Sequence, residues 1–259
     1  MSYLENIVAD VGKRLAQRRA LVPPEQLAGL PTPVRPPISF RQAVLLPGIS
    51  IIAEVKRASP SRGMLRPDLD VAQMVEAYAA GGARAVSVLT EQDHFLGDPE
   101  DLRLAASRSP IPVLRKDFIL EEYQLQEARV WGASAVLLIA ALLEPARAGA
   151  LTESARRLGL DVLLEVHDRA ELDWAARLPG VVLGINNRNL STFEVSLETT
   201  LGLMPSVPPN LPVVSESGVS SREQILQLEE AGVAGVLIGE HLARSADPGE
   251  AIGVLLGRK

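Results

Sequence analysis

Short apolar runs rich in β-branched residues recur at regular spacing along most of this chain. They lack the polar alternation of a half-exposed sheet, so they predict strands covered on both faces, as in a parallel sheet. The predicted strands are Ser50–Val55, Ala85–Leu89, Pro112–Leu114, Ala135–Ile139, Val162–Val166, Val181–Ile185, Pro212–Val214 and Val236–Ile238.

Helical patterns follow most of these runs, and glycine often stands between a helix and the next strand, as at a helix C-terminus. Eight strand–helix units predict an α/β fold, a (β/α)8 TIM barrel. A doubly wound open sheet is the alternative, but it usually has fewer strands, and no G-x-G spacing indicates a dinucleotide site. The helical patterns are Val71–Ala80, Glu122–Trp131, Pro145–Leu158, Ala170–Leu178 and Ser221–Ala231.

The amino-terminal part of the chain has a different character. Residues 3–19 carry apolar side chains at helical spacing and predict an additional amphipathic helix. The proline-rich connector Val22–Pro37 is predicted to be neither helix nor central strand. We therefore expect a single domain over residues 1–259, with an extension over 1–46 and the barrel over 47–259.

Composition excludes several functional classes. The net charge of −6 gives no reason to expect nucleic-acid binding, and the absence of cysteine excludes disulfides, thiolate metal sites and cysteine nucleophiles. No uncharged apolar stretch is long enough for a membrane span, and no signal peptide is evident, so we expect a cytoplasmic protein. His94, His167 and His241 show no metal-ligand spacing and are interpreted as turn or surface residues, and we expect no metal site.

Polar residues stand where most of the predicted strands end. In a barrel of this class, the carboxyl ends of the strands carry the active site. Alternation along the first strand places Glu54 and Lys56 on the same side, where they would meet in the interior. The other polar residues at strand ends are Thr90, Glu91, Lys116, Asp117, Glu165, His167, Asn186, Asn187, Arg188, Asn189, Ser215, Glu216, Ser217 and Glu240.

Two of these strand-end residues are lysines in a chain that otherwise prefers arginine: only four of its 26 basic residues are lysine. A sheltered lysine can give up its proton, whereas arginine stays charged, so Lys56 and Lys116 are candidates for chemistry. Other interpretations stay open. Lys56 could form a structural pair with Glu54, Lys116 could be solvated beside Arg115, and Glu165 could lie at the surface.

The glycine-containing turns after the seventh and eighth strands predict a phosphate site. In barrels, backbone N–H groups of these two loops commonly bind phosphate, and glycine allows close approach. The candidates are Ser217, Gly218 and Gly239, with the backbone of Glu240; the Glu240 carboxylate must then point away. Ordinary turn glycines are the alternative.

Residues Ile52–Ser61, IAEVKRASPS, closely resemble the signature of the indole-3-glycerol phosphate synthase family. The resemblance runs from about Phe40 to the end of the chain, in the family's order, and the amino-terminal helix resembles the family's extra helix. Only one barrel is present, so we expect no fused isomerase domain. The further matching segments are Ser87–Glu91 (SVLTE), Arg115–Phe118 (RKDF), Leu164–His167 (LEVH), Gly184–Leu190 (GINNRNL) and Ser215–Gly218 (SESG).

The resemblance implies a reaction and a division of roles. The family converts 1-(2-carboxyphenylamino)-1-deoxyribulose 5-phosphate to indole-3-glycerol phosphate, with loss of CO2 and water, in tryptophan biosynthesis. It implies no cofactor, no metal and no obligate protein partner. Lys116 matches the general acid that protonates the substrate carbonyl, and Glu165 matches the second acid/base group, used in dehydration. Lys56 matches a cation that holds the substrate's anionic groups.

The remaining site residues are implied in the same way. Glu54 and Asn186 would position the substrate, Arg188 would face the carboxylate that is lost, and Glu216 and Ser217 would complete the polar ring. The phosphate cradle would comprise Ser217, Gly218, Gly239 and Glu240. Substrate contacts are also expected from Ser59 in the signature and from an apolar wall formed by Phe95, Phe118, Leu137, Leu190 and Ile238.

Two other functions remain as alternatives. One is a sugar-phosphate isomerase or a Schiff-base aldolase on the same barrel. The other is a catalytically silent barrel that binds phosphorylated ligands, but such a protein has no need for a tuned acid and base such as Lys116 and Glu165.

Overall fold

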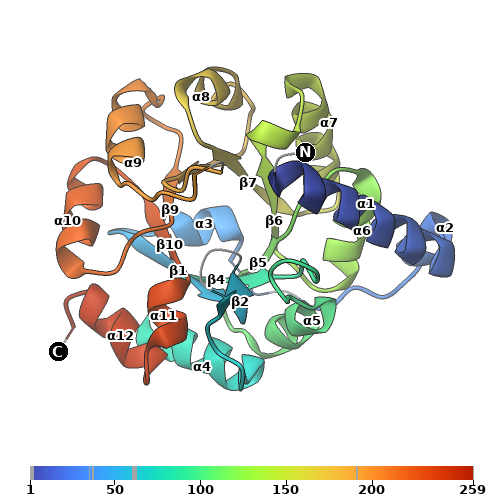
Figure 1. The fold of residues 1–259 in the computed structure, drawn as a ribbon, viewed down its shortest axis with the longest axis horizontal. Helices are drawn as coiled ribbons and strands as arrows, with labels where there is room; N and C mark the ends of the chain where they lie inside the picture. Colours follow the sequence, from blue (N-terminus) through green and yellow to red (C-terminus); the bar gives the residue numbers. More distant parts are fainter. Residues whose placement is uncertain (1–2, 35, 37, 60–62, 191, 259) are drawn as a thin grey trace.

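The computed structural model describes residues 3–34, 36, 38–59, 63–190 and 192–258. Within these residues, eight parallel strands close into a barrel in the order β1-β10-β9-β8-β7-β6-β5-β4, ringed by helices (Figure 1). All the predicted strands are confirmed, with small shifts at their ends. They are β1 Ser50–Val55, β4 Ala85–Leu89, β5 Val113–Lys116, β6 Ala135–Ile139, β7 Asp161–Val166, β8 Val182–Asn186, β9 Val213–Glu216 and β10 Gly235–Ile238.

Closure depends on β1, which pairs with both the last and the second strand of the barrel. Ser50 lies opposite Gly235 of β10, and Ile52 lies opposite Ala85 of β4. The remaining strands pair with their neighbours in chain order. The barrel prediction is therefore confirmed, and the open-sheet alternative is excluded.

Alternation along the strands separates the two largest hydrophobic clusters of the described residues. One lies between the strands and the surrounding helices, and the other fills the barrel interior with residues such as Ile52, Leu114 and Leu163. Phe40 and Val44, from the short helix α3 (Phe40–Val44), belong to the interior cluster and are buried. The Ser50 hydroxyl at the start of β1 donates to the Val44 carbonyl at 3.0 Å, which places α3 at the amino ends of the strands. The amino ends of the strands are therefore closed by α3. This leaves the carboxyl ends as the place where a cavity can open.

The predicted helices are confirmed, and side chains cap several of them. Asp70 and Ser221 accept hydrogen bonds from backbone N–H groups in the first turns of α4 and α10, which satisfies donors that have no partner within the helix. The outer helices are α4 Val71–Gly81, α5 Pro99–Arg108, α6 Glu122–Val130, α7 Pro145–Arg157, α8 Arg169–Ala175, α9 Glu198–Leu203, α10 Arg222–Glu230, α11 Glu240–Arg244 and α12 Pro248–Leu255. Shorter elements are the pair β2 Ala58–Ser59 and β3 Gly63–Met64, and the 3-10 turns Ala140–Leu142 and Met204–Ser206.

The proline-rich connector corrects one prediction. It was expected to contain no helix, but α2 spans Pro24–Ala28. Pro24 occupies the first turn, where its missing N–H group needs no partner, and no proline follows before Gly29 ends the helix. Pro37, at the end of the predicted connector, lies outside the described residues, as do Pro60 and Ser61 of the signature.

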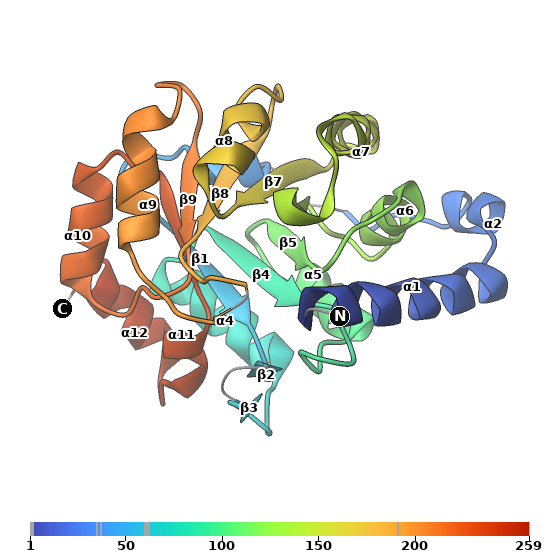
Figure 2. The same cartoon turned by 45° about the horizontal axis from the view of Figure 1, so that its top comes forward.

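The additional helix α1 (Tyr3–Leu21) is present as predicted and lies against the barrel beside α5 and α6 (Figures 1 and 2). It buries Ile7, Val11 and Leu15. Its arginines pair with acids of the barrel: Arg14 with Asp93, Arg18 with Glu127 at 2.6 Å, and Arg19 with Glu121 at 2.9 Å. These contacts fix α1 along one side of the barrel.

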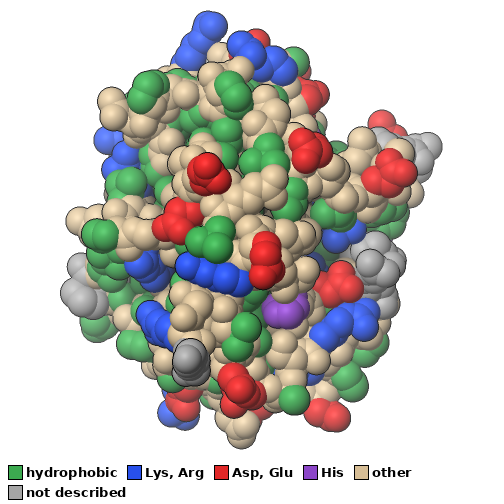
Figure 3. Space-filling model, turned by 90° about the vertical axis from the view of Figure 1, so that its left-hand side faces the viewer, with side chains coloured by type: hydrophobic (Ala, Val, Ile, Leu, Met, Phe, Trp, Pro, Cys, Tyr) green, Lys and Arg blue, Asp and Glu red, His purple; other side chains and the backbone are tan. Residues whose placement is uncertain are grey.

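On the side of the molecule that carries α9 and α10, acidic and basic side chains are interspersed (Figure 3). Among the described residues, none of the helices combines the length and the apolar character that crossing a membrane requires.

Candidate active site

A cavity of about 830 Å³ opens at the carboxyl ends of the strands, a size typical of a small-molecule site. Every residue predicted to belong to the site lines it. These residues are Glu54, Lys56, Ser59, Phe95, Lys116, Phe118, Leu137, Glu165, Asn186, Arg188, Leu190, Glu216, Ser217, Gly218, Ile238, Gly239 and Glu240.

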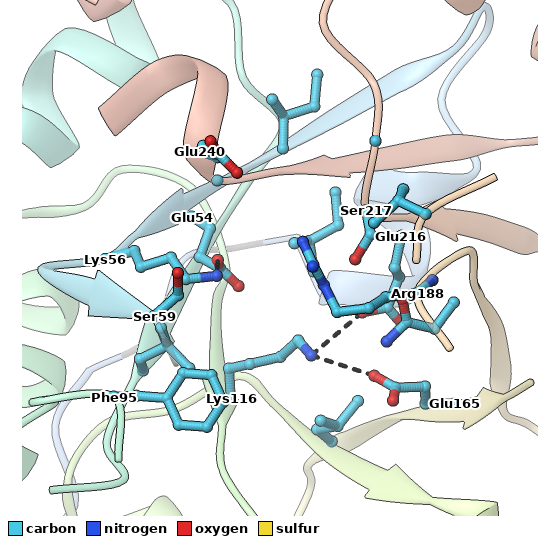
Figure 4. A pocket seen from close by; sticks show the side chains of 18 of the residues that line it. Glu54, Lys56, Ser59, Phe95, Lys116, Glu165, Arg188, Glu216, Ser217 and Glu240 are labelled. Atoms are coloured by element: carbon cyan, nitrogen blue, oxygen red, sulfur yellow. Dashed lines mark hydrogen bonds and ion pairs between the residues drawn. The ribbon is translucent and has the colours of Figure 1, made fainter. Parts of the chain in front are cut away.

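Lys116 ends β5 and extends into the cavity toward two carboxylates (Figure 4). Its Nζ lies 3.1 Å from Oε2 of Glu165 on β7 and 3.3 Å from Oε2 of Glu216 on β9. Burial alone would lower the pKa of Lys116, but Glu165, Glu216 and Glu54 outweigh burial and raise it. Lys116 is therefore a cation that carries a proton at neutral pH.

Strand alternation explains why Lys116 lies in the interior while Arg115 does not. Leu114 and Lys116 face inward, and Arg115 faces the helices, where it is 1% exposed, pairs with Asp117 at 2.8 Å and stacks on Trp131 at 4.3 Å. The interpretation of Lys116 as solvated beside Arg115 is wrong, because both residues are held by partners on opposite sides of the strand.

The two carboxylates that share Lys116 differ in charge. Burial would raise the pKa of Glu165, but the cations of Lys116 and His167 lower it, so this carboxylate is ionised. Burial and the nearby Glu165 raise the pKa of Glu216 to about 8 despite Lys116. Glu216 is 1% exposed, and a Cβ atom at Gly184 would collide with its carboxylate. The glycine thus leaves the space in which this acid is buried.

Glu54 and Lys56 meet on the inner side of β1, as predicted. Lys56 Nζ donates to Glu54 Oε1 at 2.9 Å and lies 6.0 Å from the centre of the Phe95 ring. A Cβ atom at Gly239 would collide with the Glu54 carboxylate, so this glycine also makes room for an acid. The arrangement presents a cation to the cavity beside an aromatic face (Figure 4).

The loop after β9 has positive φ angles at two successive residues. Ser217 has φ 68° and Gly218 has φ 90°, which is a left-handed backbone conformation that residues other than glycine rarely adopt. Asn187 holds the loop by donating to the Ser217 carbonyl at 3.0 Å. After β10, the Glu240 carboxylate pairs with Arg244 of its own helix at 3.3 Å, an arrangement in which its charge is partly neutralised.

Part of the apolar lining comes from a segment that sequence reasoning did not assign to the site. Phe95 and Phe118 lie with their ring centres 6.0 Å apart, as expected for a wall. Tyr3, Leu4 and Ile7 of α1 also line the cavity, together with Phe193. Tyr3 packs edge-on against Phe193, with ring centres 5.4 Å apart. The helical spacing of apolar residues in α1 indicated that one face is buried, but it did not show that this face packs against the cavity.

His167 corrects the interpretation of the histidines. It lies in the turn after β7, as predicted, but its side chain is only 13% exposed. Nε2 lies 3.1 Å from Glu165 Oε1, and Nδ1 lies 3.2 Å from Glu171 Oε2. Burial would lower the pKa of His167, but the two carboxylates outweigh burial and raise it to about 10. The only sequence signal was its place two residues after Glu165.

Glu165 is also not at the surface, which settles that alternative: it is 2% exposed and faces Lys116. Arg188 lines the cavity and donates through Nη1 to the Phe193 carbonyl at 3.3 Å. In the part of the chain that the structure describes, no group of His, Cys, Asp and Glu is placed to hold a metal ion. The cavity combines a proton donor, an ionised carboxylate, further cations and an apolar wall, which suits proton transfers on an anionic, partly aromatic molecule.

Comparison with known proteins gives a consistent result. The family model described as indole-3-glycerol phosphate synthase matches residues 4–255. An indole-3-glycerol phosphate synthase from an Exiguobacterium species is 48% identical, with 96% of this chain and 94% of that protein covered. The one from Salinibacter ruber is 44% identical, with 97% and 94% covered.

Solved structures with low sequence identity share the fold. A tryptophan synthase complex from Pyrococcus furiosus matches with a TM-score of 0.60 at 17% identity, covering 80% of this chain and 98% of that one. A 3-hexulose-6-phosphate synthase from Salmonella typhimurium matches with a TM-score of 0.64 at 12% identity, covering 82% and 100%. At these identities the similarity concerns the barrel alone.

Proposed function

The chain belongs to the indole-3-glycerol phosphate synthase family, and we propose that the cavity at the carboxyl ends of its strands is where it closes the indole ring. The family reaction is a decarboxylation and a dehydration of 1-(2-carboxyphenylamino)-1-deoxyribulose 5-phosphate in tryptophan biosynthesis. The observation that carries the proposed site is the Lys116 ammonium, which is held in the cavity between Glu165 and Glu216.

In the proposed first half, Lys116 is the general acid. It donates a proton to the carbonyl oxygen while the aromatic ring carbon attacks the carbonyl carbon, so no alkoxide develops. Loss of CO2 from the same ring carbon then leaves its bonding electrons in the ring. Only a group that can release its proton serves here, which arginine does not do.

In the proposed second half, Glu165 is the base. The hydroxyl group formed from the carbonyl leaves as water: Lys116, which has regained a proton from solvent, protonates that oxygen, and a proton is removed from the neighbouring carbon. Glu165 is ionised and can accept the carbon-bound proton. The 3.1 Å contact between Glu165 and Lys116 lets a proton pass between acid and base afterwards.

The other cations and the loops hold the substrate in this proposal. Lys56, kept in place by Glu54, attracts the anionic groups, and Arg188 faces the carboxylate that is lost. Asn186, Ser59 and Ser217 position the polyol chain. The phosphate lies on backbone N–H groups of the loops after β9 and β10, at Gly218, Gly239 and Glu240. The aromatic ring packs against Phe95, Phe118, Leu137, Leu190 and Ile238.

The lining of the cavity supports action without an obligate protein partner, because one chain supplies the proposed acid, base, cations and wall. We also propose that the protein works in the cytoplasm, where this pathway supplies its phosphorylated substrate.

A fluorescence assay for indole-3-glycerol phosphate tests the proposal. Purified wild-type enzyme is expected to form the product, and Glu165→Gln is expected to lose at least about 100-fold in kcat while keeping its fold. Glu230→Gln, an exposed residue at the end of α10, is the control. Near wild-type turnover in Glu165→Gln would remove Glu165 from the chemistry. Borohydride trapping with substrate is expected to give no covalent lysine adduct, whereas a Schiff-base aldolase would give one.

A further inference from the structure

The His167 ring lies behind Glu165, on the side away from Lys116. Oε1 of Glu165 faces His167 Nε2 at 3.1 Å, whereas Oε2 of the same carboxylate faces Lys116 Nζ at 3.1 Å. The other side of the imidazole meets Glu171 of α8, whose Oε2 lies 3.2 Å from Nδ1 and accepts the backbone N–H of His167 at 2.7 Å. Glu165 is thus enclosed between two basic side chains, of which His167 is not among the residues lining the cavity.

The environment of the ring determines its protonation. Both ring nitrogens lie against carboxylate oxygens, and an ionised carboxylate accepts hydrogen bonds without donating any. A neutral imidazole would point one nitrogen lone pair at one of these oxygens, whereas an imidazolium presents N–H on both sides. The Nε2 contact is a close ion pair and not an aligned hydrogen bond, so charge contributes more to it than direction does.

The charge on His167 matters because Lys116 forms ion pairs with two carboxylates. Lys116 lies nearly equidistant from Glu165 and Glu216, at 3.1 and 3.3 Å, and both acids are buried. Two like charges that share one cation in a buried site do not both ionise readily. Lys116 alone therefore does not decide which acid carries the negative charge.

We propose that His167 is a positioning residue, whose cation places the negative charge on Glu165 and leaves Glu216 neutral. This inference rests on the proposed role of Glu165 as the base. The groups that act on the cluster are Glu54 from β1, Lys116 from β5, Asn186 from β8 and Glu216 from β9, with Glu171 from α8 holding His167. Among the cations, Lys116 contacts both acids, whereas His167 contacts Glu165 and not Glu216. The Glu54 carboxylate acts in the same direction, because its charge raises the pKa of Glu216.

The charge on His167 can be observed directly, without substrate. Nitrogen-15 NMR of the histidine rings, with the His167 signal identified by its absence in His167→Gln, is expected to show both nitrogens protonated in wild type at pH 8. An ordinary histidine is mostly neutral at that pH. A neutral ring at pH 8 overturns the inference, and because this reading uses the wild-type protein, it does not depend on whether the variant folds.

Kinetics test the effect on Glu165. His167→Gln keeps an N–H donor but removes the charge, so kcat is expected to fall at least about 10-fold with KM changed less than about 2-fold. The acid limb of the kcat–pH profile is expected to move to higher pH, because Glu165 then takes up a proton more easily. Arg169→Gln is the matched control: it removes a cation from the start of α8, but its side chain faces solvent and pairs with Asp173.

An unchanged kcat, or a lower kcat with an unmoved acid limb, would overturn the positioning role, since a purely structural histidine affects stability without moving that limb. If Glu165→Gln is inactive and His167→Gln has normal kinetics, only the positioning role of His167 is excluded. If Glu165→Gln is active, the proposed role of Glu165 as the base is excluded, and the inference about His167 is excluded with it.

Discussion

The Lys116 ammonium lies 3.1 Å from Oε2 of Glu165, across the barrel mouth from β5 to β7. The proposed acid and base are thus in contact before substrate binds, and their opposite charges offset the free-energy cost of burying each of them. Placing the two on separate strands of a closed barrel fixes their distance by the strand register, which no loop movement changes.

Replacement of Lys116 by arginine tests the proton donor. Lys116→Arg keeps the positive charge that Glu165 and Glu216 face, so the fold is expected to survive. Arginine releases no proton at neutral pH, so kcat is expected to fall at least about 100-fold. Steady-state fluorescence kinetics measure the loss. Lys13→Arg, on the exposed face of α1, is the control and should match wild type. Turnover close to wild type in Lys116→Arg would exclude this lysine as the acid.

Glu216 is expected to lower stability as pH rises. Its pKa is about 8 in the folded protein and near the ordinary 4.5 when unfolded. Between these values the unfolded chain gives up this proton first, so the free energy of unfolding falls as pH rises from 4.5 to 8. Glu216→Gln removes this dependence and is expected to be roughly 1–3 kcal/mol more stable than wild type at pH 8, and about equal to it at pH 4.5.

Urea unfolding of both proteins at the two pH values measures this difference. Glu230→Gln, at the exposed end of α10, is expected to show no such divergence. If Glu216→Gln is less stable than wild type at pH 8, Glu216 is ionised in the folded protein and the assignment of charge between the two acids is wrong.

The loop after β9 is expected to bind the phosphate of the substrate. Gly218→Asp adds a negative charge and bulk at a left-handed residue whose Cβ would meet Val195. The affinity for indole-3-glycerol phosphate is expected to fall at least about 10-fold, the effect of about 1.4 kcal/mol. Fluorescence titration measures this affinity. Gly202→Asp carries the same charge on α9, where no atom lies within 4 Å of the new Cβ, and should bind normally. Equal affinity in the two variants would argue against a phosphate site at Gly218.

The amino-terminal helix is expected to contribute to substrate binding. Tyr3→Ala removes the edge-on contact with Phe193 and part of the cavity wall. A contact between Tyr3 and the substrate's aromatic ring is worth about 0.5–1.5 kcal/mol, so its loss is expected to raise KM roughly 2- to 10-fold with kcat nearly unchanged. Leu21→Ala, on the same helix but 80% exposed, is the control. A normal KM in Tyr3→Ala would show that α1 lies beside the cavity without contributing to substrate binding.

The barrel could be predicted because its signals are local. Each strand is an apolar run, and strand alternation decides which side chains face inward, so the meeting of Glu54 and Lys56 followed from the sequence alone. The strand ends also made Lys116 and Glu165 candidates for the site, since all carboxyl ends of a parallel barrel converge, but their roles came from the family resemblance.

Other features depend on distant partners or on single turns and could not be predicted. The period of α1 shows one apolar face but does not reveal that Tyr3 reaches the cavity. The five residues of α2 lie in a segment where proline dominates the pattern. His167 is paired by Glu171 on the following helix and by Glu165 on the strand, and its spacing resembles no motif.

The plug that Phe40 and Val44 form at the amino ends of the strands has a consequence for how such an enzyme can diversify. Substitutions in the loops at the opposite end can remodel the cavity without disturbing the packing that closes the barrel. A lineage built on this scaffold can therefore acquire a new substrate preference while the determinants of folding stay constant.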